Sequence, residues 1–246
     1  HVYWTGGRRV LFRSEADGSN TVHRYFSGVL AGKDIVEIHM THGAIFLRID
    51  DGAESGESIW RLSLAQFESG RPELVHRSSD VINGSRYTRL TVGESRLITS
   101  VRGDAIEHVI SIGLGHVFGG LCSLNDEASC GVHLTRLEGI ITAGDWRADH
   151  RGWLYGLRLQ SGPGMNDAML FRFEPGLERL SDNECPSAQC AAVVEGLGHV
   201  SSFTLFRGAI YWTELENGGF RRSLGPRAEI VQVLDWPCHL RLDPFF

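Results

Sequence analysis

Residues 208–214, with the sequence GAIYWTE, decide the fold of this chain. They follow a turn and open an apolar, strand-like run, and the N-terminal residues 1–6, HVYWTG, closely match their Tyr-Trp-Thr core. A weaker copy, GAIFL, stands at residues 43–47. Because a repeated unit changes how the whole chain is interpreted, these copies are the starting point for any assignment of the fold.

Each copy is accompanied by further strand-like runs. Residues 10–14 and 220–224 follow the first and last copies, and a third, more variable run comes after them. Residues 36–40 and 202–206 precede the copies at positions 43 and 208. The repeating unit is therefore predicted to be a four-stranded antiparallel meander.

The rest of the chain has the same character. Short runs of alternating apolar and polar residues, broken by Gly, Asp, Asn and Ser, predict β-strands, and helical periodicity is almost absent. The clearest predicted strands are residues 36–40, 45–49, 59–64, 97–101, 153–159, 169–173 and 203–206. No linker or low-complexity run divides the 246 residues. We expect one all-β domain over residues 1–246.

The spacing of the repeats bears on the number of units. The sequence GLGHV occurs at residues 113–117 and again at 196–200, and half of that offset is about 41 residues, close to one β-propeller blade. Six blades are therefore favoured. The YWT-like anchors number only five, at residues 3, 46, 98, 154 and 211. A sixth blade would have to lie within residues 116–143, and five longer blades are the alternative.

The two ends of the chain fit together. Residues 236–244, WPCHLRLDP, have the form of the strand that precedes a YWT strand, and the chain begins with such a strand. A closed ring hides the edges of its first and last blades. We therefore expect the C-terminal strand to pair with the YWT strand at residues 2–5 and close the ring.

These features resemble the YWTD-repeat β-propellers of lipoprotein-receptor-type and matrix proteins. The matching motif residues are Tyr3, Trp4, Thr5, Tyr211, Trp212 and Thr213. In that family the Asp of the tetrad hydrogen-bonds between neighbouring blades, whereas Gly6 and Glu214 occupy its position here. An equivalent bond is open to Glu214 but not to the side chain of Gly6, so the chain is a divergent member.

The resemblance implies an extracellular receptor, matrix or scaffold domain that binds a protein ligand through a face of loops. It implies no catalysis, no cofactor and no metal. Such a domain is often part of a larger multidomain chain or assembly. We therefore expect a protein-binding module in the extracellular space or the lumen of the secretory pathway.

Cysteine spacing agrees with secretion. The two local pairs lie in polar, turn-rich segments and lack the CxxC spacing of a structural zinc site, so we expect disulfide bonds within each pair. The pairs are Cys122 with Cys130, and Cys185 with Cys190. Cys238 is left over, either buried as a small apolar group or paired outside the domain.

A sequon and the bulk charge add to this picture. Asn83 begins an N-G-S triplet, which is a glycosylation site if it lies in an exposed loop of a secreted protein. The formal net charge is -6 with no basic stripe, which argues against nucleic acid as a partner. No apolar stretch is long enough to insert into a membrane.

The sequence contains no G-x-S-x-G elbow and no H-E-x-x-H motif, so it gives no support for hydrolase chemistry. The polar run at residues 145–151 alternates acids and arginines on one strand face, which predicts a salt-bridged solvent face rather than a metal site. The enzyme alternative is a calcium-dependent propeller hydrolase. Such a hydrolase would bind calcium in the central channel of the propeller, and the candidate ligands are the side chains of Glu37, Asp104, Asp145 and Asn166. A third alternative is a glycan-binding propeller whose blades repeat a similar aromatic pocket, and the uneven repeats of this chain weigh against it.

The six tryptophans divide into two groups. Trp4, Trp60 and Trp212 stand at repeat or apolar positions and are predicted to pack in blade cores. The other three lie close to turns, where an aromatic side chain is able to face a partner. The binding residues suggested on this basis are Trp146, Trp153 and Trp236.

Overall fold

The computed structural model describes residues 1–41, 43–69, 71–93, 96–103, 106–113, 132–159, 168–181, 189–214, 218–223 and 229–234. These residues form β-strands and turns, and the predicted all-β class is confirmed. The helices among them are single 3-10 turns, η1 (Gly28–Leu30), η2 (Leu64–Gln66) and η3 (Ser78–Asp80). Within the described ranges no helix has the length and apolar character that a membrane span requires.

The strands form five sheets that follow one another along the chain. The first sheet contains β1 (Val2–Gly6), β2 (Val10–Ser14) and β3 (Val22–Tyr25). The second contains β4 (Asp34–Thr41), β5 (Ala44–Gly52), β6 (Gly56–Ser63) and β7 (Glu73–Arg77). The third contains β8 (Thr91–Val92), β9 (Arg96–Arg102), β10 (Ile106–Gly113), β11 (Val132–Glu138) and β15 (Arg179–Ser181). The fourth contains β12 (Ile141–Ala148), β13 (Leu154–Leu159), β14 (Ala168–Phe173) and β16 (Cys190–Leu197). The fifth contains β17 (Val200–Phe206), β18 (Ala209–Glu214), β19 (Gly218–Ser223) and β20 (Ile230–Leu234).

The alternation in the sequence explains how these sheets pack. In β5, Ile45, Leu47 and Ile49 belong to the core shared with the first sheet, while Ala44 and Phe46 belong to the core shared with the third. Successive side chains of a strand point to opposite faces, so an apolar run buries both faces of an inner sheet. All seven strands predicted most clearly from the sequence correspond to observed strands: β4, β5, β6, β9, β13, β14 and β17.

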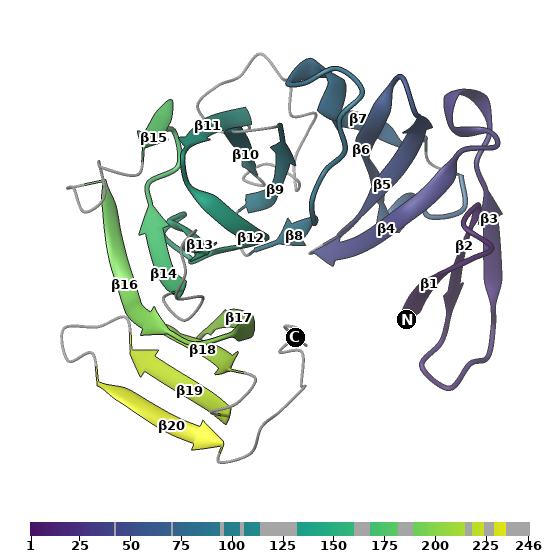
Figure 1. The fold of residues 1–246 in the computed structure, drawn as a ribbon. Helices are drawn as coiled ribbons and strands as arrows, with labels where there is room; N and C mark the ends of the chain where they lie inside the picture. Colours follow the sequence, from purple (N-terminus) through teal and green to yellow (C-terminus); the bar gives the residue numbers. More distant parts are fainter. Residues whose placement is uncertain are drawn as a thin grey trace.

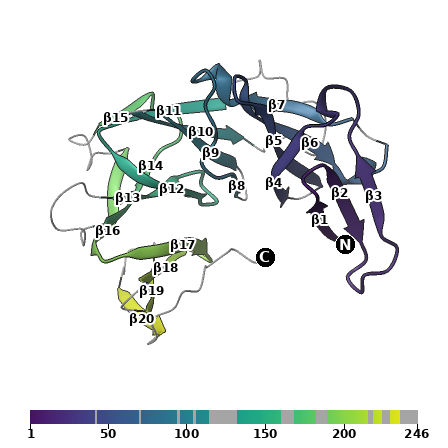
Figure 2. The same ribbon diagram turned by 45° about the vertical axis from the view of Figure 1, so that its right-hand side comes forward.

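Neighbouring sheets pack face to face around an arc (Figure 1). Four hydrophobic cores join the first sheet to the second, the second to the third, the third to the fourth and the fourth to the fifth. Strands β4, β8, β12 and β17 contact one another in chain order, and both views place them on the inside of the arc (Figures 1 and 2). This radial order of mainly antiparallel sheets is a β-propeller-like fold.

The YWT-like anchors occupy equivalent places in the arc. They lie in β1, β5, β9, β13 and β18, one in each sheet. In the second to fifth sheets the anchor strand is the second strand, but β1 is the first described strand of its sheet. The place of one inner strand beside β1 is thus open within the described residues. Residues 236–244, predicted to fill it, lie outside those residues.

The segment expected to hold a sixth blade does not form a separate sheet where it is described. Val132–Glu138 is β11 of the third sheet, and β12 from Ile141 onward opens the fourth. The two GLGHV copies also stand at different strands, because Gly113 ends the third strand of one sheet and Leu197 ends the fourth strand of the next. Their offset therefore does not measure two blades.

A cluster of ion pairs in the second sheet is hydrogen-bonded to the segment that leads into the third sheet. Arg48 Nε donates a 2.8 Å hydrogen bond to Glu57, and its Nη1 donates 3.0 Å hydrogen bonds to Glu37 and to the carbonyl of Thr88. Glu57 is 1% exposed and also accepts a 2.9 Å hydrogen bond from the backbone N–H of Tyr87, which precedes the third sheet. One arginine on β5 is thereby fixed to groups from both sheets.

A second carboxylate connects the third and fourth sheets. Glu107 of β10 is buried and accepts hydrogen bonds from the hydroxyls of Ser100 and Thr142, the latter on β12. Glu214, which stands where the tetrad has Asp, accepts a 3.0 Å hydrogen bond from Nε1 of Trp212 on its own strand. Among the described contacts, the carboxylates that bridge neighbouring sheets include those of Glu57 and Glu107, which lie outside the tetrad position.

Candidate functional site

The first sheet exposes a row of aromatic side chains on the face turned away from the second sheet. This aromatic face consists of Val2, Trp4, Phe12, His23 and Tyr25. Trp4 pairs with Phe12 across β1 and β2, and Phe12 pairs with His23 across β2 and β3. Val2, Trp4 and Tyr25 are 48%, 38% and 69% exposed. An exposed apolar face of this kind is a common feature of interaction surfaces.

The rings of the aromatic face contact one another in sequence. Trp4 and Phe12 are stacked, with centroids 5.3 Å apart and an interplanar angle of 7°. His23 lies 6.2 Å from Phe12, and its ring meets that of Tyr25 edge-on at 5.5 Å. Each ring therefore limits the rotamers of the next, which lowers the entropy lost when a partner binds.

Alternation along β1 and β2 places the aromatic face on the outside. Tyr3 and Leu11 point the other way and pack in the core shared with the second sheet. A Cβ at Gly6, at the end of β1, would lie 2.5 Å from the ring of Phe12, so a larger residue there would displace this ring. This contact gives a physical reason for the glycine at the position where the tetrad has Asp.

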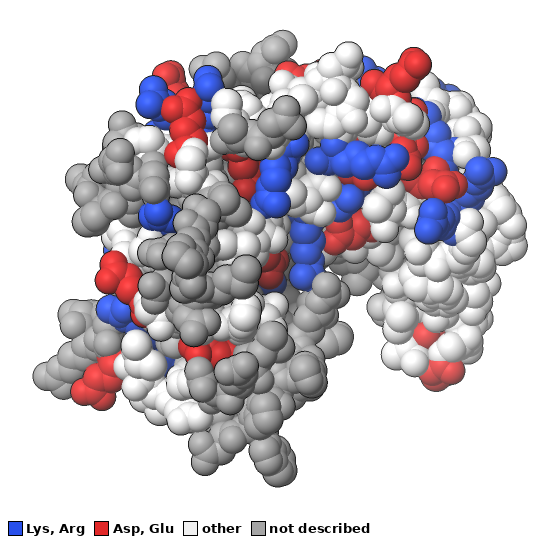
Figure 3. All heavy atoms as spheres, viewed as in Figure 1, with Lys and Arg blue, Asp and Glu red and all other residues white. Residues whose placement is uncertain are grey.

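The equivalent face is buried elsewhere in the arc. Trp212 stacks on Phe220 with centroids 5.6 Å apart, as Trp4 stacks on Phe12, but Trp212 is only 1% exposed. The fourth sheet covers it in a shared hydrophobic core. The prediction that repeat tryptophans are buried is confirmed for Trp212 and for Trp60, and it is wrong for Trp4. Where the first sheet lies, at the lower right of Figure 3, few charged side chains are in view.

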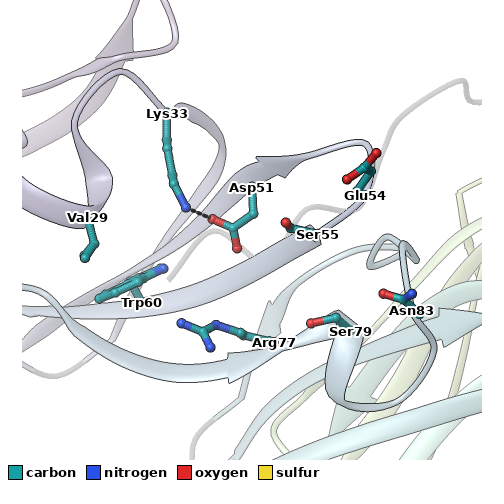
Figure 4. A pocket seen from close by; sticks show the side chains of 9 residues that line it. All are labelled: Val29, Lys33, Asp51, Glu54, Ser55, Trp60, Arg77, Ser79 and Asn83. Carbon is teal, nitrogen blue, oxygen red and sulfur yellow. Dashed lines mark hydrogen bonds and ion pairs between the residues drawn. The ribbon is translucent and has the colours of Figure 1, made fainter.

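A second feature is a cavity of about 470 Å³ beside the second sheet (Figure 4). The η1–β4 connection, the β5–β6 turn, strands β6 and β7, and η3 with the turn after it all contribute to its wall. Its lining residues are Val29, Lys33, Asp51, Glu54, Ser55, Trp60, Arg77, Ser79 and Asn83. Its volume lies in the range of small-ligand sites.

Charged groups in this cavity differ in how they are held. Lys33 Nζ forms an ion pair with Asp51, whose side chain is 8% exposed. Glu54 and Arg77 are exposed, and no described residue forms a hydrogen bond or ion pair with either side chain. Nε1 of Trp60 donates a 2.7 Å hydrogen bond to Ser58, which fixes the indole ring at the wall. The cavity thus has charged side chains without a described partner at its rim and a rigid indole ring in its wall.

The tryptophans suggested as binding residues lie in other surroundings. Trp146 is fully buried, with its ring edge-on to Phe171 and Phe173, so the suggestion that it faces a partner is corrected. Trp153 is half-buried beneath the guanidinium of Arg172, 4.8 Å from the ring centroid. Trp236 lies outside the described residues. The turn signals near Trp146 misled the prediction because the strand continues as far as Ala148.

The acidic residues considered for calcium have structural partners where they are described. Glu37 is bound by His39 at 2.7 Å and by Arg48, and Arg147 donates a 2.7 Å hydrogen bond to Asp145. Burial raises the pKa of Glu37, but these contacts and the N–H of Leu90 outweigh it, so the pKa lies below its ordinary value. Asp104 and Asn166 are outside the described ranges, within which no cluster of three His, Cys, Asp or Glu side chains is suited to a metal ion.

The polar run at residues 145–151 keeps its salt bridge but not its predicted geometry. Asp145 and Arg147 pair as expected, although the side chain of Arg147 is only 6% exposed, so this is not a solvent face. Asp149 lies beyond the end of β12, in a turn, where it accepts hydrogen bonds from the backbone N–H groups of Arg151 and Trp153. The strand alternation therefore stops at residue 148.

Cys190 is disulfide-bonded, and the other four cysteines lie outside the described residues. Asn83 is exposed in the turn after η3 and lines the rim of the cavity. We expect non-reducing peptide mapping to join Cys122 with Cys130 and Cys185 with Cys190. Free thiols at all four positions would contradict an extracellular location.

Sequence reasoning missed both the aromatic face and the cavity. The alternation of aromatic residues at positions 4, 12, 23 and 25 was present, but only the register of three strands shows that they share one face. The cavity residues come from five separated segments, and no local spacing connects them. Such a site therefore cannot be recognised from the sequence before the fold is known.

Comparison with known proteins places the chain by its fold alone. No family model matches the sequence, and no curated protein matches it. Among solved structures the chain is similar to oligopeptidase B from Leishmania major, with a TM-score of 0.51 and 12% sequence identity. The match covers 91% of this chain and 30% of that protein, so the chain spans less than a third of its length. At this identity the likeness concerns the fold and not the activity.

Proposed function

We propose that this chain is an extracellular protein-binding module built on a propeller of the YWTD type, and that it binds its partner through the aromatic face of the first sheet. The observation that carries the proposal is the exposure of Trp4 and Tyr25 on the outer face of the first sheet. The equivalent face of the fifth sheet, which contains Trp212, is buried against the neighbouring fourth sheet. Trp and Tyr are the residues most often found at the energetic centre of protein interfaces. The proposed binding surface is therefore a face of the first sheet, and not the face of loops that the resemblance implies.

The partner is a β-sheet with apolar side chains on one face. Every interface between consecutive sheets of this chain has that form, and the face of Trp212 shows how such a sheet covers the motif tryptophan. The aromatic face continues this series by one step at the start of the arc (Figure 1). Apolar burial supplies the affinity, and the stacked rings supply the shape.

The finer architecture belongs to the same proposal. Five blades account for the five anchors, which are separated by 43, 52, 56 and 57 residues rather than by a uniform 41. Residues 236–244 would add a strand beside β1 and complete a four-stranded first blade. In this proposal the arc stays open between the fifth and first sheets, so the aromatic face remains accessible to a partner. The disulfide at Cys190 supports an extracellular setting.

Photo-crosslinking tests this proposal directly. A benzophenone side chain at position 25 is expected to crosslink the secreted partner in culture medium of the source organism, because Tyr25 is 69% exposed on the proposed surface. The crosslinked partner peptide should come from a strand of a β-sheet. A benzophenone at position 151, exposed in a turn of the fourth sheet, is the control. Crosslinks at 151 without crosslinks at 25, or crosslinks only to a second copy of the chain, would refute the proposal.

Affinity then measures the contribution of the tryptophan. We expect Trp4→Ala to weaken binding of that partner by roughly 30-fold or more, as for an interface hot spot. The Trp4→Phe variant keeps the stacking on Phe12 and should lose less. A thermal melt checks that both variants remain folded, since Trp4 is not part of any described core.

A further inference from the structure

The cavity beside the second sheet has two chemically different ends. One end contains the guanidinium of Arg77, the Lys33–Asp51 ion pair and the indole of Trp60 (Figure 4). The other end contains the hydroxyl of Ser55, the amide of Asn83 and the carboxylate of Glu54 (Figure 4). A ligand that satisfies both ends is anionic at one side and rich in hydroxyl groups at the other.

The anionic end is built for a planar, singly charged group. No described residue pairs with the guanidinium of Arg77, whose planar array of donors matches a carboxylate in a bidentate way. Lys33 is already neutralised by Asp51, so its remaining protons are available to a ligand without a second full positive charge. The carboxylates of Asp51 and Glu54 also line the cavity and disfavour a ligand of higher negative charge.

The polar end suits hydroxyl groups. A serine hydroxyl and an asparagine amide each donate and accept, while a carboxylate such as Glu54 only accepts and therefore selects donors. Trp60 is 8% exposed and is fixed by its bond to Ser58, so it provides a small, rigid apolar wall rather than an open stacking platform. A ring that carries several hydroxyls and few apolar groups fits this wall and these partners.

We propose that the cavity is a binding site for a sugar acid, in which Arg77 holds the carboxylate and Glu54, Ser55 and Asn83 hold the ring hydroxyls. This site is separate from the aromatic face, since it lies among segments of residues 29–83 on the second sheet and its approaches. It does not depend on the proposed protein partner. Its ligand class is defined by a carboxylate and adjacent hydroxyls on one ring.

Isothermal titration tests the proposal on the disulfide-bonded chain, produced without N-glycans so that Asn83 is unmodified. The probes are glucuronate, galacturonate and N-acetylneuraminate, with glucose, galactose and glucose 6-phosphate as comparisons. At least one sugar acid is expected to bind, and to bind more tightly than the neutral sugars and the phosphate. The proposal fails if no sugar acid binds better than the neutral sugars, and tighter binding of the phosphate would reassign the site to phosphorylated sugars.

A variant pair then localises the binding. Arg77→Gln is expected to weaken binding of the sugar acid by roughly tenfold or more, because a bidentate charge-assisted contact is lost. Arg151→Gln removes an exposed arginine in a turn of the fourth sheet and should leave the affinity unchanged. Equal affinities of the two variants would place any sugar-acid binding elsewhere and overturn the assignment. Both side chains are exposed, so thermal melts should match that of the original chain.

Discussion

Trp146→Ala is expected to lower the free energy of unfolding by about 3–5 kcal/mol, the usual cost of removing a large aromatic side chain from a core. The ring of Trp146 is fully buried against Phe171 and Phe173, and its Nε1 donates a 3.2 Å hydrogen bond to Ser100. A Cβ at Gly156 would lie 2.3 Å from this ring, which shows how closely the chain encloses it. Urea denaturation monitored by circular dichroism measures the change.

Trp4→Ala is the matched control for this experiment. Trp4 is 38% exposed and contacts the ring of Phe12 on a free face, so we expect a loss of about 1 kcal/mol or less. Equal losses for the two variants would contradict the placement of Trp146 in a core and of Trp4 outside one. The comparison also separates stability from binding, for which Trp4 carries the larger expected effect.

Glu57→Ala is expected to lower the free energy of unfolding by about 3 kcal/mol, because it breaks a buried ion pair and leaves its partner under-compensated. Arg48 would lose a contact of 2.8 Å and keep only its bonds to Glu37 and to the Thr88 carbonyl. The N–H of Tyr87 would also lose its acceptor. Denaturation of Glu57→Ala, Arg48→Met and the double variant measures the coupling between the two side chains.

An exposed ion pair of the same sheet provides a control. Glu73 pairs with Arg61 but its side chain is 47% exposed, so Glu73→Ala should change stability by less than about 1 kcal/mol. In the buried pair the double variant should be less destabilised than the two single changes combined. Strict additivity there would show that Arg48 and Glu57 do not act together in holding the second and third sheets.

The sequence predicted the strands well because their signal is local. In β5, the alternation of Ile45, Phe46 and Leu47 directly encodes a strand that is buried on both faces. The anchors also marked one strand in each of the five sheets. The number of blades stays a prediction, because the two identical GLGHV copies stand at different strands and their offset is not a measure of the blade period.

Burial of the tryptophans could not be predicted from the motif. Trp4 and Trp212 share their sequence context and their stacked partner, yet they differ in exposure because a neighbouring sheet covers only one of them. That difference arises from the position of each sheet in the arc. Trp146 was misjudged for the opposite reason, since the turn residues around it gave no sign that Phe171 and Phe173 enclose its ring.

The short strand β15 gives the arc an uneven mechanical strength. It leaves the fourth sheet between β14 and β16 and pairs in parallel with β11 of the third, where Leu180 is buried and Glu138 receives Arg179 at 2.9 Å. Because the chain passes from the fourth sheet to the third and back, these two sheets are linked covalently at more than one place. Under a stretching force the third and fourth sheets are expected to separate later than sheets that are joined by side chains alone.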